Sequence, residues 1–247
     1  GTVSYTTGKV KNAPNSPFNG FCLDKDIAAE LGRPIRMLND ANCFALSEAI
    51  DGAAAGASVV FGVILGTGCG GGLVIDRKPL IGANAISGEW GHNPMPWMTE
   101  AEFPGLPCKC GQTGCIETFL SGTGFAAYHY RETGEALTPE DIAARAANSD
   151  KSCDASLTRY ETRLARALAS VINIIDPDVI VLGGGISNIA RLYRNVPRLW
   201  AQWVFSDHVS TTLVAPKYGD SSGVRGAAWL WPKDIEANTG LVNETNT

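Results

Sequence analysis

The chain has 247 residues, of which 45% are hydrophobic and 18% are charged, and its net charge is −5. This composition is that of an ordinary globular protein long enough to bury a core, so it excludes intrinsic disorder, collagen-like repeats and low-complexity arrays. The acidic balance, and the lack of any Lys/Arg run, argue against nucleic acid as a partner.

No apolar run reaches the ~18 residues that suggest a membrane-spanning helix. The polar first residues also lack the apolar core of a signal peptide. We therefore predict a cytoplasmic protein without a membrane partner. The seven cysteines agree with this prediction, because an odd number does not suit a secreted disulfide framework.

The first part of the chain predicts short elements joined by glycine-rich turns. In chain order they are a hairpin or loop over 1–20, a helix from its N-cap Asp24 to Gly32, a strand over 34–38, a helix over 41–49, buried strands over 58–65 and 73–76, and a returning segment over 80–82. The run GTGCGGG at 66–72 is the predicted turn between the two buried strands.

Residues 83–118 show neither a helical nor a strand period, and a long irregular segment needs a staple or a function. The remaining elements are helices over 117–131, 139–147 and 157–175, a buried strand from 178 that enters the glycines 183–185, a helical region over 189–203 interrupted by Pro197, a strand over 212–216 and a helix over 223–231. Strands that alternate with helices predict an α/β fold.

Three cysteines fall within eight residues of the irregular segment, at Cys108, Cys110 and Cys115. With His92 they supply the soft thiolates and the imidazole that suit tetrahedral Zn²⁺. Because all four ligands come from the protein, such an ion is structural. The alternatives are unrelated buried thiols or a redox site, although a redox site favours Cys-x-x-Cys.

Glycine-rich turns follow two of the predicted strands, at 66–72 and 183–185. Turns of this kind let backbone N–H groups approach phosphate oxygens, and the pair together predicts a nucleotide cleft. A tight hairpin is the structural alternative for the first turn.

Three carboxylates stand beside these motifs. Asp40 follows a predicted strand end and could accept a hydroxyl proton, or could be only a helix N-cap. Glu89 and Glu117 flank the cysteine segment, where they could hold sugar hydroxyls or be solvated surface residues.

Taken together, these stretches resemble the ROK sugar kinases of the actin-like ATPase superfamily. The matching stretches are LNDANCFALSE (38–48), GVILGTGCGGGLVID (62–76), GEWGH (88–92), CKCGQTGCIE (108–117) and DPDVIVLGGGIS (176–187). Within the family, GEWGHNPMPW, CIETFLSGTGF and GDSSGVRGAAWLWP are most similar to bacterial fructokinases.

The resemblance implies a two-lobed actin-like fold that transfers the γ-phosphoryl group of ATP·Mg²⁺ to a hexose hydroxyl, converting D-fructose to D-fructose 6-phosphate. It makes Asp40 the catalytic base. The implied sugar ligands are Asn39, Glu89, His92 and Glu117, and the implied zinc ligands are His92, Cys108, Cys110 and Cys115. The implied ATP contacts are Gly66, Thr67, Gly68, Gly70 and Gly71 for the phosphates, and Gly183, Gly184 and Gly185 for the adenosine.

The family's N-terminal D-x-G-G-T motif, which clasps ATP phosphates, is not found in the sequence. We therefore expect about 60 residues, roughly half a lobe, to be missing, and the chain alone to be inactive. The expected division is the remainder of an N-terminal lobe over 1–55, a C-terminal lobe over 56–231 with a zinc-stapled loop at 83–118, and a polar tail over 232–247. A homodimer is expected.

Three alternatives stay open. The substrate could be mannose, glucose or N-acetylglucosamine, because all of these present a primary hydroxyl to the same base. The chain could come from a sugar-sensing regulator of the same family. It could also be a catalytically dead, zinc-stapled remnant that binds sugar without ATP turnover.

Overall fold

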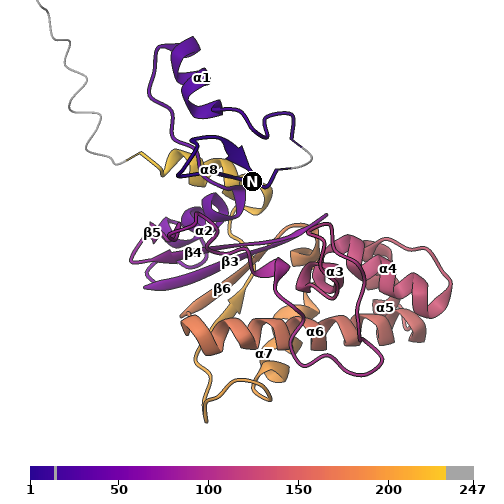
Figure 1. The fold of residues 1–247 in the computed structure, drawn as a ribbon. Helices are drawn as coiled ribbons and strands as arrows, with labels where there is room; N and C mark the ends of the chain where they lie inside the picture. The colour runs from indigo at the N-terminus through magenta and orange to yellow at the C-terminus, as the bar shows by residue number, and fades with distance from the viewer. Residues whose placement is uncertain (14–15, 232–247) are drawn as a thin grey trace, which may run out of the picture.

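The computed structural model describes residues 1–13 and 16–231, so the predicted polar tail lies outside the described residues. A mixed sheet with the strand order β5-β4-β3-β6-β7 lies at the centre and confirms the α/β class (Figure 1). Strand β3 is antiparallel to β4 and parallel to β6, and β6 is parallel to β7. The strands are β3 (Val59–Leu65), β4 (Cys69–Ile75), β5 (Lys78–Pro79), β6 (Val179–Gly183) and β7 (Thr212–Val214).

The N-terminal residues form the predicted hairpin, a two-stranded antiparallel pair of β1 (Thr2–Val3) and β2 (Val10–Lys11). The α-helices are α1 (Leu23–Leu31), α2 (Asp40–Ile50), α3 (Ile116–Leu120), α4 (Gly122–Thr133), α5 (Pro139–Ala147), α6 (Lys151–Ile175), α7 (Arg191–Trp200) and α8 (Ser222–Ala228). Short 3₁₀ turns lie at Trp90–His92, Gly185–Asn188 and Gly219–Ser221.

Strands β3 and β6 are apolar on both faces because helices cover both faces of the sheet. Phe61 and Leu182 pack in the larger cluster with Leu164 of α6. Val60 and Val181 belong to a second cluster with α2 on the opposite face. The near-continuous apolar run of β3 therefore follows from its central position in the sheet.

Helix α6 is longer than the predicted 157–175 because it begins at Lys151. Asp150 caps it by accepting hydrogen bonds from the backbone N–H groups of Ser152 and Cys153, and Asp176 ends it in a left-handed conformation. Among the described residues, no helix is both long enough and apolar enough to cross a bilayer.

Helix α2 lies between the sheet and α8, and Figure 1 shows α2 and α8 side by side. A Cβ at Gly72 would lie 2.4 Å from the Ala41 carbonyl oxygen, and one at Gly226 would lie 1.7 Å from the Cys43 carbonyl oxygen. Only glycine fits at either position, so these two residues allow the backbones to meet. Glu48 is fully buried between the same elements and accepts a hydrogen bond of 2.6 Å from Ser222 Oγ.

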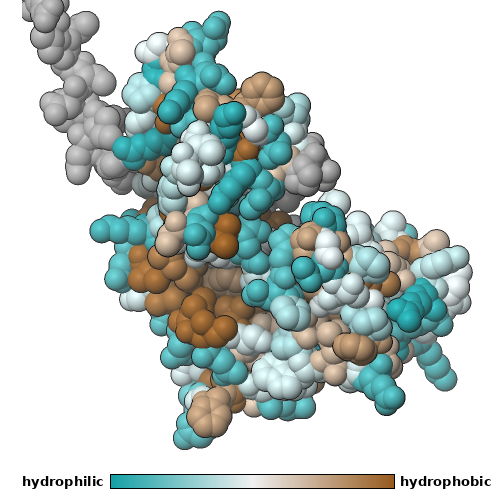
Figure 2. Space-filling view, viewed as in Figure 1, coloured by the Kyte–Doolittle hydropathy of each residue, from teal (hydrophilic) through white to brown (hydrophobic). Residues whose placement is uncertain are grey.

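The sheet edge at β5 is short and carries a lysine and a proline, Lys78 and Pro79, which disfavour pairing with another chain. Apolar side chains gather on the surface near the ends of β4 and β5 (Figure 2), where Ile75 is 40% exposed. The segment before α2 shows mostly hydrophilic side chains in the same view.

The glycine-rich segment differs from its prediction. The turn is confined to 66–68, whereas Cys69 to Gly72 belong to β4 and pair with β3. These glycines lie in a strand because β4 packs directly against backbone: the carbonyl of Ala41 on one side and that of Gly88 on the other.

Other predicted elements also change. Residues 34–38 are no strand, since they have no ladder partner among the described residues, and the edge strand lies at 78–79 rather than at 80–82. The predicted helix 117–131 is divided at Ser121, whose backbone is extended and whose Oγ caps α4 by accepting from Gly124 N. Helix α1 has Cys22, not Asp24, as its N-cap residue, and Pro197 lies inside α7.

The irregular 83–118 loop is tied to α6 by a buried ion triad. Glu102 accepts hydrogen bonds from Arg163 Nε at 2.8 Å and from Arg166 Nη2 at 2.7 and 2.8 Å, and its Oε2 also accepts from Thr99 N. Burial raises the pKa of Glu102, but the two arginines outweigh burial and bring it to about 2.

We expect Glu102→Gln to lower the free energy of unfolding by about 3–5 kcal/mol at neutral pH, because two buried guanidinium groups lose their counter-charge. The folded-state pKa lies below the ordinary value of 4.5, so this stabilisation is complete above pH 4.5 and is lost as the pH falls towards 2. Urea unfolding across this range measures the difference. Glu135→Gln, which removes an exposed pair with Arg145, is the control; equal effects of both changes would contradict the prediction.

Candidate active site

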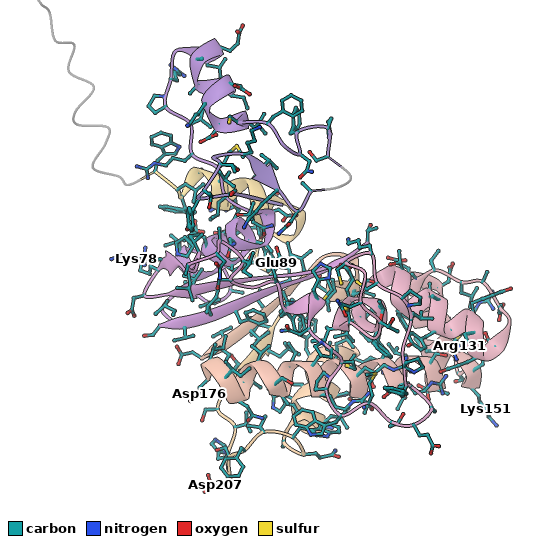
Figure 3. The ribbon with its side chains drawn as sticks, viewed as in Figure 1. Lys78, Glu89, Arg131, Lys151, Asp176 and Asp207 are labelled. Carbon is teal, nitrogen blue, oxygen red and sulfur yellow. The ribbon has the colours of Figure 1, made fainter. Side chains whose placement is uncertain are left out.

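A cavity of about 540 Å³ lies where the start of α2, the 66–68 turn, β4 and the 83–118 loop meet. It brings together the predicted base and every predicted sugar ligand and phosphate contact. These are Asn39, Asp40, Gly66, Thr67, Gly68, Gly70, Gly71, Glu89, His92 and Glu117. Figure 3 labels Glu89 at the centre of the molecule, where the sheet meets the N-terminal segment.

The sequence left open whether Asp40 is only the helix N-cap. The structure assigns that position to Asn39, whose Oδ1 accepts from Ala41 N at 2.9 Å. Asp40 is the first helical residue, is exposed, and lines the cavity. The positive end of the helix dipole favours a carboxylate at this position. Asp40 Oδ1 shares the Ala41 N–H at 3.0 Å, and the exposed carboxylate still faces the cavity, where it can meet a ligand.

Glu117 lies in the first turn of α3 and is held in place by three contacts, one of which is a hydrogen bond of 4.0 Å that Cys108 Sγ donates to its Oε1. Its Oε2 accepts from Cys69 N at 3.0 Å, and its Oε1 lies 3.3 Å from Lys109 Nζ. A Cβ at Gly68 would lie 2.8 Å from Oε2, so this carboxylate packs directly on the 66–68 turn. The predicted sugar ligand and the predicted phosphate turn are thus in contact.

Cys43 and Cys69, two buried thiols near these carboxylates, are held neutral. Burial, and then the charge of Asp40, raise the pKa of Cys43 to about 11. Burial, and then the charge of Glu117, raise the pKa of Cys69 well above its usual value. Negative charge at this end of the cavity is therefore carried by carboxylates, not by thiolates.

The loop that carries Glu89 packs on β4 through glycine. A Cβ at Gly71 would lie 2.8 Å from the Gly88 carbonyl oxygen, and Trp90 Nε1 donates to the Gly70 carbonyl at 3.1 Å. Gly88 itself has a φ of 91°, which favours glycine. This close approach places Glu89 at the cavity wall.

A second cavity, of about 410 Å³, lies between the 66–68 turn, α4, α5 and the start of the turn at 185–188. Gly66 and Thr67 line both cavities, which therefore meet at the turn. Of the three glycines predicted at the adenosine, Gly185 lines this cavity. Gly183 packs against the Phe44 ring and Gly184 against the Leu65 carbonyl, and neither lines it.

The cysteine segment forms a compact cluster with His92, and the four ligand atoms lie within 4.8 Å of one another. Cys108 Sγ lies 3.6 Å from His92 Nδ1, and Cys110 Sγ lies 3.6 Å from Cys115 Sγ. Zn–S bonds of ~2.3 Å place tetrahedral ligand atoms about 3.8 Å apart, so these residues fit one zinc ion.

The structure adds cavity residues that the sequence analysis missed. Lys109 stands between two predicted zinc ligands, yet its ammonium group reaches Glu117. Asn12 and Ser16 come from the N-terminal segment, which carries no motif. The position of Lys109 inside the cysteine motif could have indicated it; nothing local marks the other two.

The comparisons with known proteins agree with this geometry. A model described as ROK family matches residues 1–234. The N-acetyl-D-glucosamine kinase of Photobacterium profundum is 42% identical over 215 residues, which are 85% of this chain and 71% of the relative. The ROK hexokinase from Thermus thermophilus superposes with a TM-score of 0.82 at 24% identity, covering 96% of this chain and 78% of that chain. A ROK family glucokinase from Streptomyces griseus, solved with glucose and AMPPNP, has a TM-score of 0.78 at 26% identity, covering 93% and 78%.

The sheet order and these superpositions define an actin-like ATPase fold, as the sequence resemblance predicted. The chain belongs to the ROK family, and the relatives described above are sugar kinases. The local motifs pointed to fructokinases, whereas the curated relative is named for N-acetylglucosamine.

We expect the purified protein to contain one zinc ion per chain and Cys110→Ser to lose it, because a structural site needs all four ligands. Metal analysis by mass spectrometry measures the content, and limited proteolysis reports any opening of the 83–118 loop. Cys22→Ser, outside the cluster, is the control. Unchanged zinc in Cys110→Ser would contradict the assignment.

Proposed function

We propose that the chain carries the sugar site of an ATP-dependent kinase that phosphorylates N-acetyl-D-glucosamine on its primary hydroxyl. The observation that supports a kinase most directly is the wall shared by the two cavities. Gly66 and Thr67 lie between a carboxylate-lined cavity that suits a sugar and a second cavity that suits a nucleoside. A phosphoryl group crossing between the ligands would pass this turn.

Asp40 is proposed as the general base that accepts the proton of the attacking hydroxyl. Asn39, Glu89, His92 and Glu117 are proposed to orient the sugar through its other hydroxyls. Gly66, Thr67, Gly68, Gly70 and Gly71 are proposed to line the ATP phosphate site, with Gly185 nearest the adenosine. The N–H donors are proposed to come from Thr67 and Gly68, because Gly66 N donates to the Gly68 carbonyl and Cys69 N donates to Glu117. A Mg²⁺ ion bound with ATP would neutralise phosphate charge.

Zinc is proposed to act through the loop rather than on the reacting atoms. Cys115 is the residue before α3, the helix that carries Glu117, and His92 follows Glu89 by three residues. An ion bound to His92 and the three cysteines would therefore fix both sugar-binding carboxylates. This role is positional, since protein ligands fill all four coordination sites.

The sugar is the finer part of the proposal. N-acetylglucosamine is the preferred substrate in this proposal because a relative named N-acetyl-D-glucosamine kinase is 42% identical over most of this chain. Fructose, which the local motifs favoured, is the competing substrate. The same base and the same turn serve either sugar, since both present a primary hydroxyl.

We expect Asp40→Asn, in a protein that also carries the family's D-x-G-G-T segment, to reduce turnover by about 10²–10⁴-fold, the usual contribution of a general base. A coupled ADP-release assay over N-acetylglucosamine, fructose, mannose and glucose measures both turnover and specificity. Asp207→Asn, an exposed aspartate far from Glu89 in Figure 3, is the matched control. Full activity of Asp40→Asn would exclude it as the base. Sugar binding without turnover in the same D-x-G-G-T-containing protein with Asp40 intact would favour the regulator or the remnant.

We expect Lys109→Met to raise KM for the sugar by up to about fivefold, because the half-exposed pair with Glu117 is worth ~1 kcal/mol at most. Initial-rate kinetics measure the change, and Lys109→Arg should retain the pairing. Lys78→Met, on the edge strand, is the control. A change in KM for ATP alone would contradict a role in positioning Glu117.

A further inference from the structure

A third cavity, of about 630 Å³, lies away from the proposed catalytic site, between α4, α6 and the 97–102 part of the irregular loop. We call it the arginine cavity after four residues in its wall. They are Arg131, Arg159, Arg163 and Arg166. Arg131 lies at the end of α4, well separated from Glu89 in Figure 3.

The charges of the arginine cavity do not balance. Its wall holds four arginines but only two carboxylates, Glu102 and Glu132, which leaves two positive charges. Glu102 is shared by the buried Arg163 and Arg166, and Glu132 pairs with Arg159. The Arg131 side chain is exposed and has no hydrogen bond or ion pair within residues 1–13 and 16–231.

Two buried polar atoms in this wall also lack partners. Arg166 Nε and Tyr128 Oη make no hydrogen bond in the described structure, although Arg166 is 3% and Tyr128 4% exposed. Buried donors are rarely left unpaired. One unit of the excess charge belongs to the buried Arg163 and Arg166, which share Glu102, and buried charge is costly unless an opposite charge compensates it. An anion in the cavity would supply that charge.

The kind of anion follows from the number of charges and the shape of the donors. A phosphate monoester carries about two negative charges at neutral pH, which matches the excess in the wall. Guanidinium groups bind phosphate oxygens in a bidentate way. Trp97 and Trp203, also in the wall, offer apolar surface against which the organic part of an ester can pack.

We propose that the arginine cavity is a binding site for a small phosphate monoester, separate from the proposed sugar and nucleotide cavities. Its phosphate group is bound by Arg131 and Arg159 at the open side, over the Glu102 triad. The ligand would also lie beside the loop that carries Glu89 and His92, because Trp97 and Thr99 of that loop line the cavity. Arg166 ties the loop to α6 by donating to the Trp97 carbonyl, and Glu102 accepts from Thr99 N.

Isothermal titration calorimetry on the full chain tests the site, with glucose 6-phosphate, inorganic phosphate and glucose as probes. We expect glucose 6-phosphate and inorganic phosphate to bind. We expect added glucose to leave the binding of inorganic phosphate unchanged. Arg131→Gln and Arg159→Gln should each weaken phosphate binding about tenfold or more, through the loss of a charge-assisted hydrogen bond. Both side chains are partly or largely exposed, so melting temperatures should stay close to that of the unsubstituted chain. Arg145→Gln, an exposed arginine on α5 paired with Glu135, is the matched control.

Tighter binding of glucose 6-phosphate than of inorganic phosphate would support the site and identify a phosphorylated sugar as its ligand. Equal binding of the two would support the site with free phosphate as its ligand. No phosphate binding, or binding unchanged in both Arg131→Gln and Arg159→Gln, would overturn the proposal. Because no turnover is measured, these outcomes do not depend on whether the chain is a kinase.

Discussion

The proposed catalytic site depends on the close packing of helix α2 against the sheet. Four glycines make it possible: a Cβ would approach Ala45 at Gly62, Ala41 at Gly72, Phe44 at Gly183 and Cys43 at Gly226, each to less than 3 Å. At each position the glycine lets a strand or α8 approach the helix more closely than any side chain would permit. The first residue of this helix is Asp40, so its distance from the 66–68 turn follows directly from that packing.

A second constraint acts on the irregular loop over 83–118, whose own regular structure is limited to short turns and two isolated β-bridges, Pro94 with Cys115 and Pro107 with Thr113. One part is tied to α6 by the Glu102 triad, and another is gathered by His92 and the three cysteines. Glu89 lies three residues before His92, and Glu117 lies two residues after Cys115. Two independent anchors reduce the conformational freedom of this long loop. Glu89 and Glu117 therefore keep a fixed position relative to each other, which binding one sugar requires.

The loop also connects two cavities of opposite charge. The proposed sugar cavity contains three carboxylates and one lysine, whereas the arginine cavity has an excess of two positive charges. Both take part of their wall from the same loop. A ligand bound in either cavity would therefore contact the loop that also lines the other cavity. Through this loop, the proposed phosphate ester would be able to change the affinity of the sugar site.

The sequence by itself determined the α/β class, the family, and the carboxylates and glycines that meet in the first cavity. Local sequence patterns encode these features: an apolar run for β3, a cysteine spacing for the metal cluster, and short motifs around Asp40 and Glu89.

The tertiary structure decided what several of those residues do. Gly183 and Gly184 resemble a nucleotide turn in sequence, yet they pack against Phe44 and Leu65, and Asn39 takes the capping role that the sequence had left open to Asp40. No local sequence pattern marked Asn12, Ser16 or the arginine cavity. The reason is physical: periodicity and spacing record backbone bias and burial along one segment, whereas a side chain's partners are set by distant segments that only folding brings within a few ångströms.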